Sequence, residues 1–222
     1  MSSMAGLAYF VGPEVSGPTV LLLHSWHGLN SASKRLADRL ADEGFTVLAP
    51  DLLAGAQPAT PAEAESTLAA SDPNDLVAAT LGGLGVLGRT DASPVRVVGM
   101  GMGGSLGLWL SVRRAAQVEA VVSFYGTQSI DFDGSKARYQ LHLADDDPWV
   151  NSDDAVFMEA TIGLSDLTIE SFTYPGTRPG FFEEGEFFAP EAAELAWSRL
   201  LPFLRIETSD VRFQRPDQRS DI

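Results

Sequence analysis

A chain of 222 residues, 45% of them hydrophobic, is long enough to bury one substantial core, and we expect a single domain over residues 1–206. Its 30 acidic and 15 basic residues give a net charge of −15, which opposes binding to nucleic acid or to an anionic membrane surface. The sequence contains no cysteine, which excludes disulfides, thiolate metal ligands and a cysteine nucleophile.

Short apolar runs alternate with amphipathic stretches along the chain. This alternation is typical of a mostly parallel sheet with helices on both faces, so we expect a doubly wound, three-layer α/β sandwich. Strands are predicted at Thr19–Leu23, Phe45–Ala49, Val95–Val98, Ala120–Phe124, Tyr139–Leu143 and Leu167–Tyr174. Helices are predicted at Ser33–Glu43, from Pro61 onward, at Asp72–Leu84, from Ser105, from Ser152 or Asp153 to Ile162, and at Glu191–Leu204.

The ends of the chain carry little structural signal. Met1–Gly6 lack the basic and long apolar stretches of a signal peptide, and no apolar run reaches the length of a membrane span. We therefore expect a cytoplasmic protein that does not enter membranes. Residues 207–222 turn polar, with arginines among acids, and we expect them to form a C-terminal tail.

The turn after the strand Val95–Val98 has the most specific pattern. Gly99-Met100-Gly101-Met102-Gly103 joins this strand to an apolar helix. A strand, a Gly-x-nucleophile-x-Gly turn and a helix form the nucleophile elbow of α/β-hydrolases, in which a sharp turn lifts a reactive side chain above the sheet. The central position here is Gly101, which has no side chain to attack a carbonyl carbon.

Three other segments complete the pattern: Leu23–Asn30 after the first strand, Leu141–Trp149, and Phe172–Phe182 with its Tyr-Pro-Gly. In order and spacing, these segments and the elbow resemble the dienelactone hydrolase family of small single-domain α/β-hydrolases. The resemblance runs from about Val20 to Leu204. It implies an α/β-hydrolase fold and a family chemistry directed at ester or lactone bonds.

Members of this family use a Cys or Ser nucleophile, an Asp and a His. By position these fall on Gly101, Asp147 and Pro179, so only the aspartate is retained. The glutamate that many relatives carry after the first strand is replaced by Ser25. The resemblance also implies an oxyanion hole from the backbone N–H groups of Trp26 and Met102, which needs no side chain.

Removing the nucleophile or base of such a triad lowers kcat by about 10⁶. Our leading hypothesis is therefore a catalytically impaired relative that binds a small anionic or apolar molecule in the former active site. Loops that follow strands form ligand crevices in α/β folds. The candidate pocket residues there are Ser25, His27, Met100, Tyr125, Trp149 and Phe181.

Two alternatives remain open. One is an active esterase or lactonase with a relocated site, in which Ser25 or Ser105 is the nucleophile and His27 the base. The other is a structural or partner-binding subunit, as a monomer or a homodimer. We expect no cofactor and no metal, because His24 and His27 have no obvious third ligand nearby. The segment Phe181–Phe188 alternates aromatic and acidic residues and is expected to pack back onto the core as a lid.

Overall fold

The structure is a computed structural model and describes residues 8–13, 17–90 and 94–206. Within them, seven strands form one sheet in the order β1-β3-β2-β4-β5-β6-β7. The neighbouring strands run parallel, except that β1 is antiparallel to β3 at the edge. The strands are β1 (Ala8–Val11), β2 (Thr19–Leu23), β3 (Thr46–Pro50), β4 (Val95–Met100), β5 (Val118–Phe124), β6 (Arg138–Ala144) and β7 (Ile169–Tyr174).

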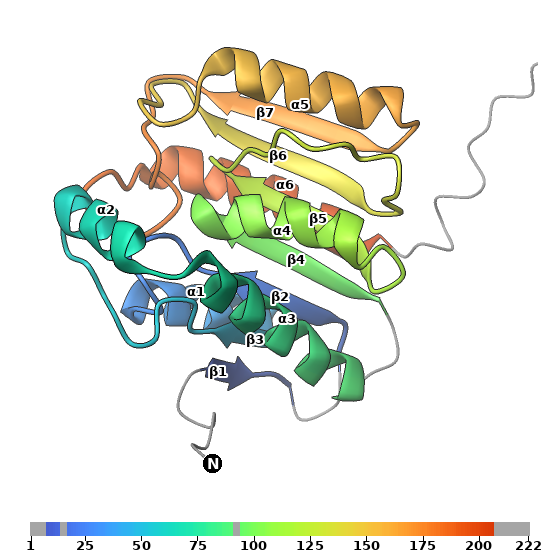
Figure 1. Ribbon diagram of the computed structural model, residues 1–222, viewed down its shortest axis with the longest axis horizontal. Helices are drawn as coiled ribbons and strands as arrows, with labels where there is room; N and C mark the ends of the chain where they lie inside the picture. Colours follow the sequence, from blue (N-terminus) through green and yellow to red (C-terminus); the bar gives the residue numbers. More distant parts are fainter. Residues whose placement is uncertain (1–7, 14–16, 91–93, 207–222) are drawn as a thin grey trace, which may run out of the picture.

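Helices cover both faces of the sheet (Figure 1). They are α1 (Ser31–Asp42), α2 (Pro61–Ala70), α3 (Pro73–Thr90), α4 (Met102–Arg113), α5 (Ser152–Leu164) and α6 (Pro190–Arg205). Residues of α1 and α6 pack into the hydrophobic core on one face, and residues of α3, α4 and α5 pack into the core on the other. The predicted doubly wound, three-layer α/β sandwich is confirmed.

Two elements differ most from the sequence-based expectation, and α4 begins at Met102, three residues before the predicted Ser105. The strand β1 was not predicted, although its four residues are all apolar; it is a short edge strand whose residues alternate between exposed and half-buried positions. The helix α3 continues to Thr90 instead of ending near Leu84. Glycines weaken this segment as an isolated helix, but one of them lets the helix lie close to the sheet: a Cβ on Gly83 would lie 2.9 Å from Leu21 Cδ1. The expected tail at 207–222 lies outside the described residues.

Local capping signals in the sequence act as expected. The Thr60 hydroxyl accepts a hydrogen bond from the Glu63 backbone N–H at the start of α2, and Pro61 takes the first helical position. Gly44, with a φ of +95°, follows the end of α1 in the left-handed conformation. These local signals therefore set helix ends that the pattern of apolar residues leaves open.

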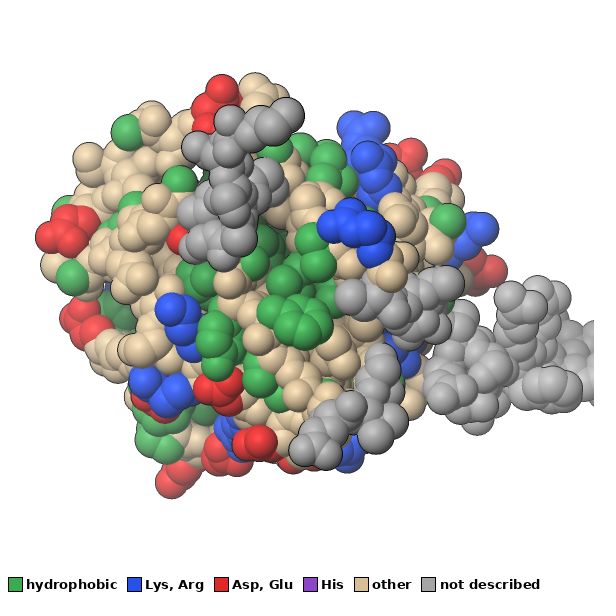
Figure 2. Space-filling model, turned by 90° about the horizontal axis from the view of Figure 1, so that it is seen from below, with side chains coloured by type: hydrophobic (Ala, Val, Ile, Leu, Met, Phe, Trp, Pro, Cys, Tyr) green, Lys and Arg blue, Asp and Glu red, His purple; other side chains and the backbone are tan. Residues whose placement is uncertain are grey.

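Among the described residues, none of the helices has both the length and the apolar character needed to cross a bilayer. On the face drawn in Figure 2, Lys and Arg side chains lie scattered among acidic ones around a central group of hydrophobic side chains. The described residues of that face therefore form no continuous basic stripe of the kind that follows a nucleic-acid backbone.

Candidate active site

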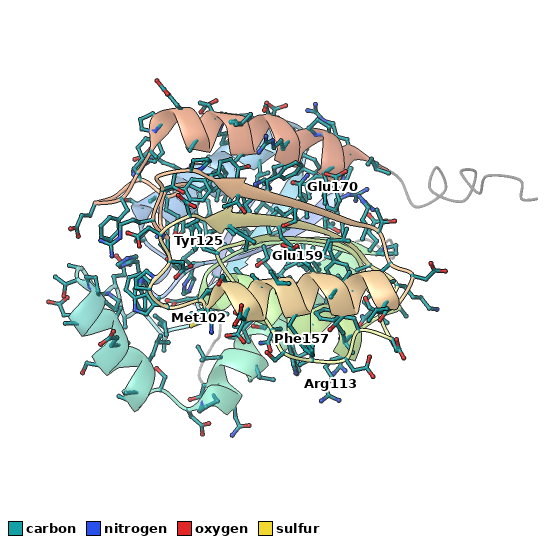
Figure 3. All side chains as sticks on the ribbon, turned by 90° about the horizontal axis from the view of Figure 1, so that it is seen from above. Met102, Arg113, Tyr125, Phe157, Glu159 and Glu170 are labelled. Atoms are coloured by element: carbon teal, nitrogen blue, oxygen red, sulfur yellow. The ribbon has the colours of Figure 1, made fainter. Side chains whose placement is uncertain are left out.

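A cavity of about 480 Å³ lies where the parallel strands end, and its wall includes residues of the loops that follow β2, β4, β5 and β6. Figure 3 shows Met102 and Tyr125 at this end of the sheet and Arg113 at the far end of α4. The helix α2 contributes Leu68 to the wall. A crevice at the carboxyl ends of the strands is the usual ligand site of an α/β sheet.

The elbow keeps its strained backbone although the reactive side chain is missing. Gly101 has φ +50° and ψ −114°, its N–H donates to the Phe124 carbonyl at 2.8 Å, and its own carbonyl accepts from the Ser105 N–H at 3.0 Å. A Cβ built on Gly101 would meet only Tyr125 Cδ2, at 3.8 Å. The site therefore has room for a side chain at this position, and glycine leaves that room open.

Close packing behind the elbow fixes where α4 begins. A Cβ on Gly103 would lie 2.2 Å from the Leu23 carbonyl oxygen, so only glycine lets the helix approach the end of β2 this closely. Met102 is the first helical residue, and both Met102 and Trp26 line the cavity. Their backbone N–H groups have no acceptor among the described residues, so both can donate to a ligand oxygen.

The three residues at the triad positions all line this one cavity. Asp147, however, is engaged within its own turn: Oδ1 accepts from the backbone N–H groups of Trp149 at 2.9 Å and Val150 at 3.0 Å. Burial raises the pKa of Asp147 above its usual value. Pro179 supplies no titratable group. The triad positions therefore keep a fixed carboxylate at Asp147. They lack the imidazole that this carboxylate would orient and the nucleophile that the imidazole would activate.

Both ring nitrogens of His27 are engaged by groups other than the two serines. Its Nδ1 lies 3.0 Å from the Pro58 carbonyl oxygen, which can only accept, so the ring hydrogen resides on Nδ1. Its Nε2 accepts from Trp26 Nε1 at 3.1 Å. No hydrogen bond joins the ring to Ser25 or Ser105, although all three residues line the cavity. The proposed Ser–His27 pair is therefore not formed.

The other two histidines are structural. His24 is fully buried, and its Nε2 accepts from the Leu52 N–H at 2.9 Å. His142 is fully buried between the Tyr174 hydroxyl and Gln140, and burial lowers its pKa to about 3. Among the described residues, no group of three or more His, Asp or Glu side chains is placed to hold a metal ion.

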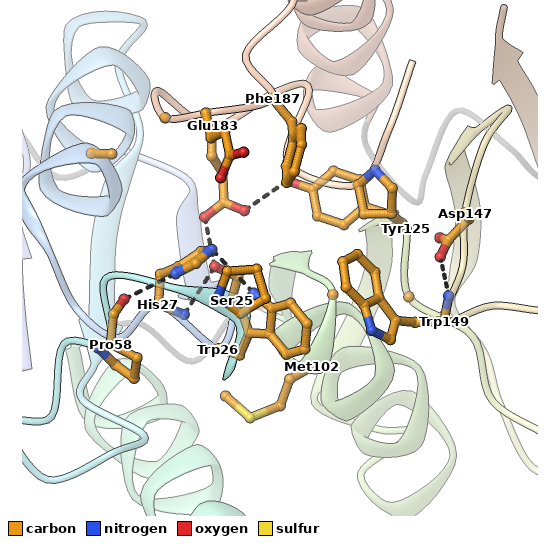
Figure 4. Close-up of a pocket in the computed structure, with 18 of the residues that line it drawn as sticks. Ser25, Trp26, His27, Pro58, Met102, Tyr125, Asp147, Trp149, Glu183 and Phe187 are labelled. Atoms are coloured by element: carbon orange, nitrogen blue, oxygen red, sulfur yellow. Dashed lines mark hydrogen bonds between the residues drawn. The ribbon is translucent and has the colours of Figure 1, made fainter. Parts of the chain in front are cut away.

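Glu183 is the site residue that sequence reasoning missed. Ser25 Oγ donates to Glu183 Oε1 at 2.9 Å, and the Tyr125 hydroxyl donates to Oε2 at 2.7 Å (Figure 4). Burial first, and then the Glu183 charge, raises the pKa of Tyr125 well above its usual value, so the phenol stays a neutral donor. The signal was present in the alternating aromatic and acidic residues of Phe181–Phe188, but it did not indicate which acid faces the cavity.

Backbone strain marks the same cluster. Tyr125 has a φ of +41°, a conformation that residues with a side chain rarely adopt. Its backbone N–H donates to the His142 carbonyl at 2.8 Å while its hydroxyl reaches Glu183. Such strain persists only where the surroundings hold it, and it gathers at functional sites.

Aromatic side chains form much of the remaining wall. The rings of Trp26 and Trp149 meet edge to face with centroids 4.7 Å apart, and Phe187 lies across the cavity. Two of the predicted wall residues are placed differently: Met100 and Phe181 are fully buried in the core and do not line the cavity. Met100 is the last residue of β4, Phe181 packs on Tyr174, and both belong to the core cluster that includes residues of α1 and α6.

Comparison with known proteins agrees with this geometry. A relative from Aquifex aeolicus (strain VF5), named "Putative carboxymethylenebutenolidase", is 26% identical over 211 residues, covering 89% of this chain and 91% of the relative. A "Probable 2-oxo-3-(5-oxofuran-2-ylidene)propanoate lactonase" from Bradyrhizobium sp is 27% identical over 228 residues, covering 90% and 88%. The crystal structure of the dienelactone hydrolase-like promiscuous phosphotriesterase P91, from metagenomic libraries, superimposes with a TM-score of 0.77 at 23% identity, covering 91% of this chain and 94% of that one.

The sheet order, the elbow and these structural neighbours define an α/β-hydrolase fold. The model of the dienelactone hydrolase family matches residues 7–207, and the chain therefore belongs to the dienelactone hydrolase family.

Proposed function

We propose that this protein is a member of the family that does not hydrolyse esters by the inherited route and instead binds a small molecule in the cavity. The observation that carries the proposal is the elbow itself. Its backbone holds the strained geometry of a nucleophile turn, and there is space above it, but the residue is Gly101. Without a nucleophile, the covalent acyl-enzyme step has no attacking atom.

The other triad positions support the same conclusion. Asp147 is engaged by two amides of its own turn, and Pro179 stands at the histidine position. The cavity nevertheless keeps its volume, its aromatic wall and two free backbone donors, at Trp26 and Met102. These features favour retained binding over retained covalent catalysis.

A fluorophosphonate probe tests the proposal, because it reacts with activated serines. We expect no labelling of the wild-type protein and no turnover of p-nitrophenyl acetate above the buffer rate. The double variant Gly101→Ser/Pro179→His is the positive control, since it returns both missing groups to their positions. Labelling of the wild type at any serine would overturn the proposal. If no small molecule raises the melting temperature, the part of the proposal that assigns a binding role to the cavity is wrong.

One observation favours a second candidate, an esterase with Ser25 as its nucleophile. The Ser25 hydroxyl already donates to a carboxylate, that of Glu183, so a hydroxyl–base pair exists in the cavity even though the pair with His27 does not. In the fluorophosphonate experiment this candidate requires labelling at Ser25 that is lost in Glu183→Gln. The absence of that adduct in the wild type excludes it.

A further inference from the structure

We infer that the ligand of this cavity is an organic cation with an apolar body. The inference rests on the proposed function, since it names the chemical class of the molecule that the cavity binds. The helix N-terminus at the elbow carries a partial positive charge and by itself would favour an anionic ligand. The carboxylates and aromatic rings around the cavity favour a positively charged ligand instead.

Among the residues that the structure describes, those that line the cavity include four carboxylates and neither lysine nor arginine. The four are Asp147, Glu183, Glu184 and Glu186. A concave site lined by charges of one sign focuses the potential inside it and concentrates ligands of the opposite charge. An anionic ligand would meet this potential without a cationic side chain of the lining to pair with.

Glu183 is the half-buried carboxylate that neighbouring side chains hold in place in the cavity, whereas Glu186 is exposed. Glu184 forms a salt bridge with Arg35, and the Asp147 carboxylate accepts two turn amides. Glu183 has two neutral hydroxyl partners, one on each oxygen, at 2.9 and 2.7 Å. A carboxylate offers about four acceptor sites, so roughly two of them remain open. Its negative charge is therefore positioned by Ser25 and Tyr125 without being neutralised by them.

The aromatic wall suits a cation as well. Trp26, Trp149 and Tyr125 line the same cavity, and Figure 4 draws them around one opening with Glu183. Phe187 also lines it, but the Arg178 guanidinium already lies 4.7 Å from its ring centroid. The electron-rich faces of such rings attract an ammonium group by about 0.5–2 kcal/mol, and tryptophan does so most strongly. The hydrogen bond from Trp26 Nε1 to His27 helps to hold the indole orientation. A trimethylammonium group is thus the simplest head that both the rings and Glu183 can bind.

The anion-favouring end of α4 does not outweigh these groups. A helix N-terminus carries roughly half an elementary charge, whereas each carboxylate carries a full one. The free N–H groups of Trp26 and Met102 can instead receive a neutral oxygen, such as a carbonyl or an ether, elsewhere on the ligand.

The experiment compares three probes with one benzyl body and tetrahedral heads of different charge: benzyltrimethylammonium, its neutral isostere 2,2-dimethylpropylbenzene, and phenylmethanesulfonate. Binding to the full chain is followed by the melting temperature and by tryptophan fluorescence, to which Trp26 and Trp149 of the cavity contribute together with Trp109 and Trp197. We expect the cation to bind about tenfold more tightly than the isostere, and the sulfonate more weakly than either.

The variant Glu183→Gln separates charge from shape. We expect it to bring the affinities for the cation and the isostere to within about threefold of each other, while isostere binding shows that the cavity is intact. Glu65→Gln is the matched control, because it removes the same charge from an exposed position of α2 outside the lining and should leave the ratio unchanged.

The outcomes separate two questions: whether the cavity binds a small molecule, and whether that molecule is a cation. If the isostere or the sulfonate binds the wild type as tightly as the cation, the cavity is a binding site but its ligand is not a cation. An unchanged preference for the cation in Glu183→Gln would show that the Glu183 charge does not recognise the cation, and it would contradict the inference. If none of the probes binds, both the inference and the binding role are overturned.

Discussion

The Ser25 hydroxyl donates a 2.9 Å hydrogen bond to Glu183, although 158 positions separate the two residues in the chain. By the family resemblance, Ser25 stands where many relatives carry a glutamate close to the nucleophile. Here the carboxylate comes from the loop between β7 and α6 and reaches the serine that replaces the lost acid. A negative charge is thus present in the cavity although the local sequence after β2 no longer supplies it.

A double-mutant cycle on Ser25→Ala and Glu183→Gln measures this link. A hydrogen bond to a charged group that is partly shielded from water contributes about 1–2 kcal/mol, so we expect a coupling energy of that order in urea unfolding. The Tyr125→Phe variant supplies a second cycle through the other carboxylate oxygen. Purely additive effects of the two changes would show that the hydroxyl and the carboxylate do not interact in solution.

Replacing Gly101 with cysteine tests the geometry of the elbow. The chain has no other cysteine, and the cavity has space at this position, so we expect iodoacetamide to add one label to the variant and none to the wild type. A side chain at a φ of +50° costs about 1–2 kcal/mol of stability. Turnover of p-nitrophenyl acetate should stay at background, because no histidine is placed to activate the thiol. A thiol that resists labelling in the folded variant would mean that the elbow does not open to the cavity.

His142 makes stability depend on pH. Its pKa is about 3 in the fold and about 6.5 in the unfolded chain, so the unfolded state binds one more proton between these values. The stability from the buried neutral ring is complete above pH 6.5 and is lost as the pH falls toward 3. Between pH 7 and pH 5 we expect about 2 kcal/mol of loss from this residue. In His142→Gln that part of the slope should vanish, and an equal slope in both proteins would contradict the assignment.

A buried ion pair ties the middle of the sheet to α6. Arg96 and Glu119 are 2.8 Å apart with both side chains less than 10% exposed, and Arg96 Nε donates to the Leu204 carbonyl. Removing one partner of such a pair leaves a buried charge, so we expect Glu119→Ala to lower the free energy of unfolding by about 3 kcal/mol.

The exposed pair of Arg39 and Glu194, 2.9 Å apart, is the matched control for this substitution. Breaking it with Glu194→Ala should cost less than about 1 kcal/mol in the same unfolding measurement, because water screens both charges. Equal costs for the two substitutions would show that burial does not set the strength of the central pair.

Much of the fold follows from local patterns. The continuous apolar run of β2, the cap at Thr60 and the glycine-rich elbow each act over a few residues, where hydrophobic periodicity and backbone conformation leave few alternatives. The resemblance to the dienelactone hydrolase family placed Gly101, Asp147 and Pro179 at the triad positions, and all three do lie on one cavity.

Only the tertiary structure decided which side chains face that cavity. It buried Met100 and Phe181, directed both nitrogens of His27 to Pro58 and Trp26, and brought Glu183 to Ser25 and Tyr125. These outcomes depend on contacts between loops that follow different strands. The spacing of residues along the chain does not encode such contacts, because the packing of the whole sheet fixes how those loops meet.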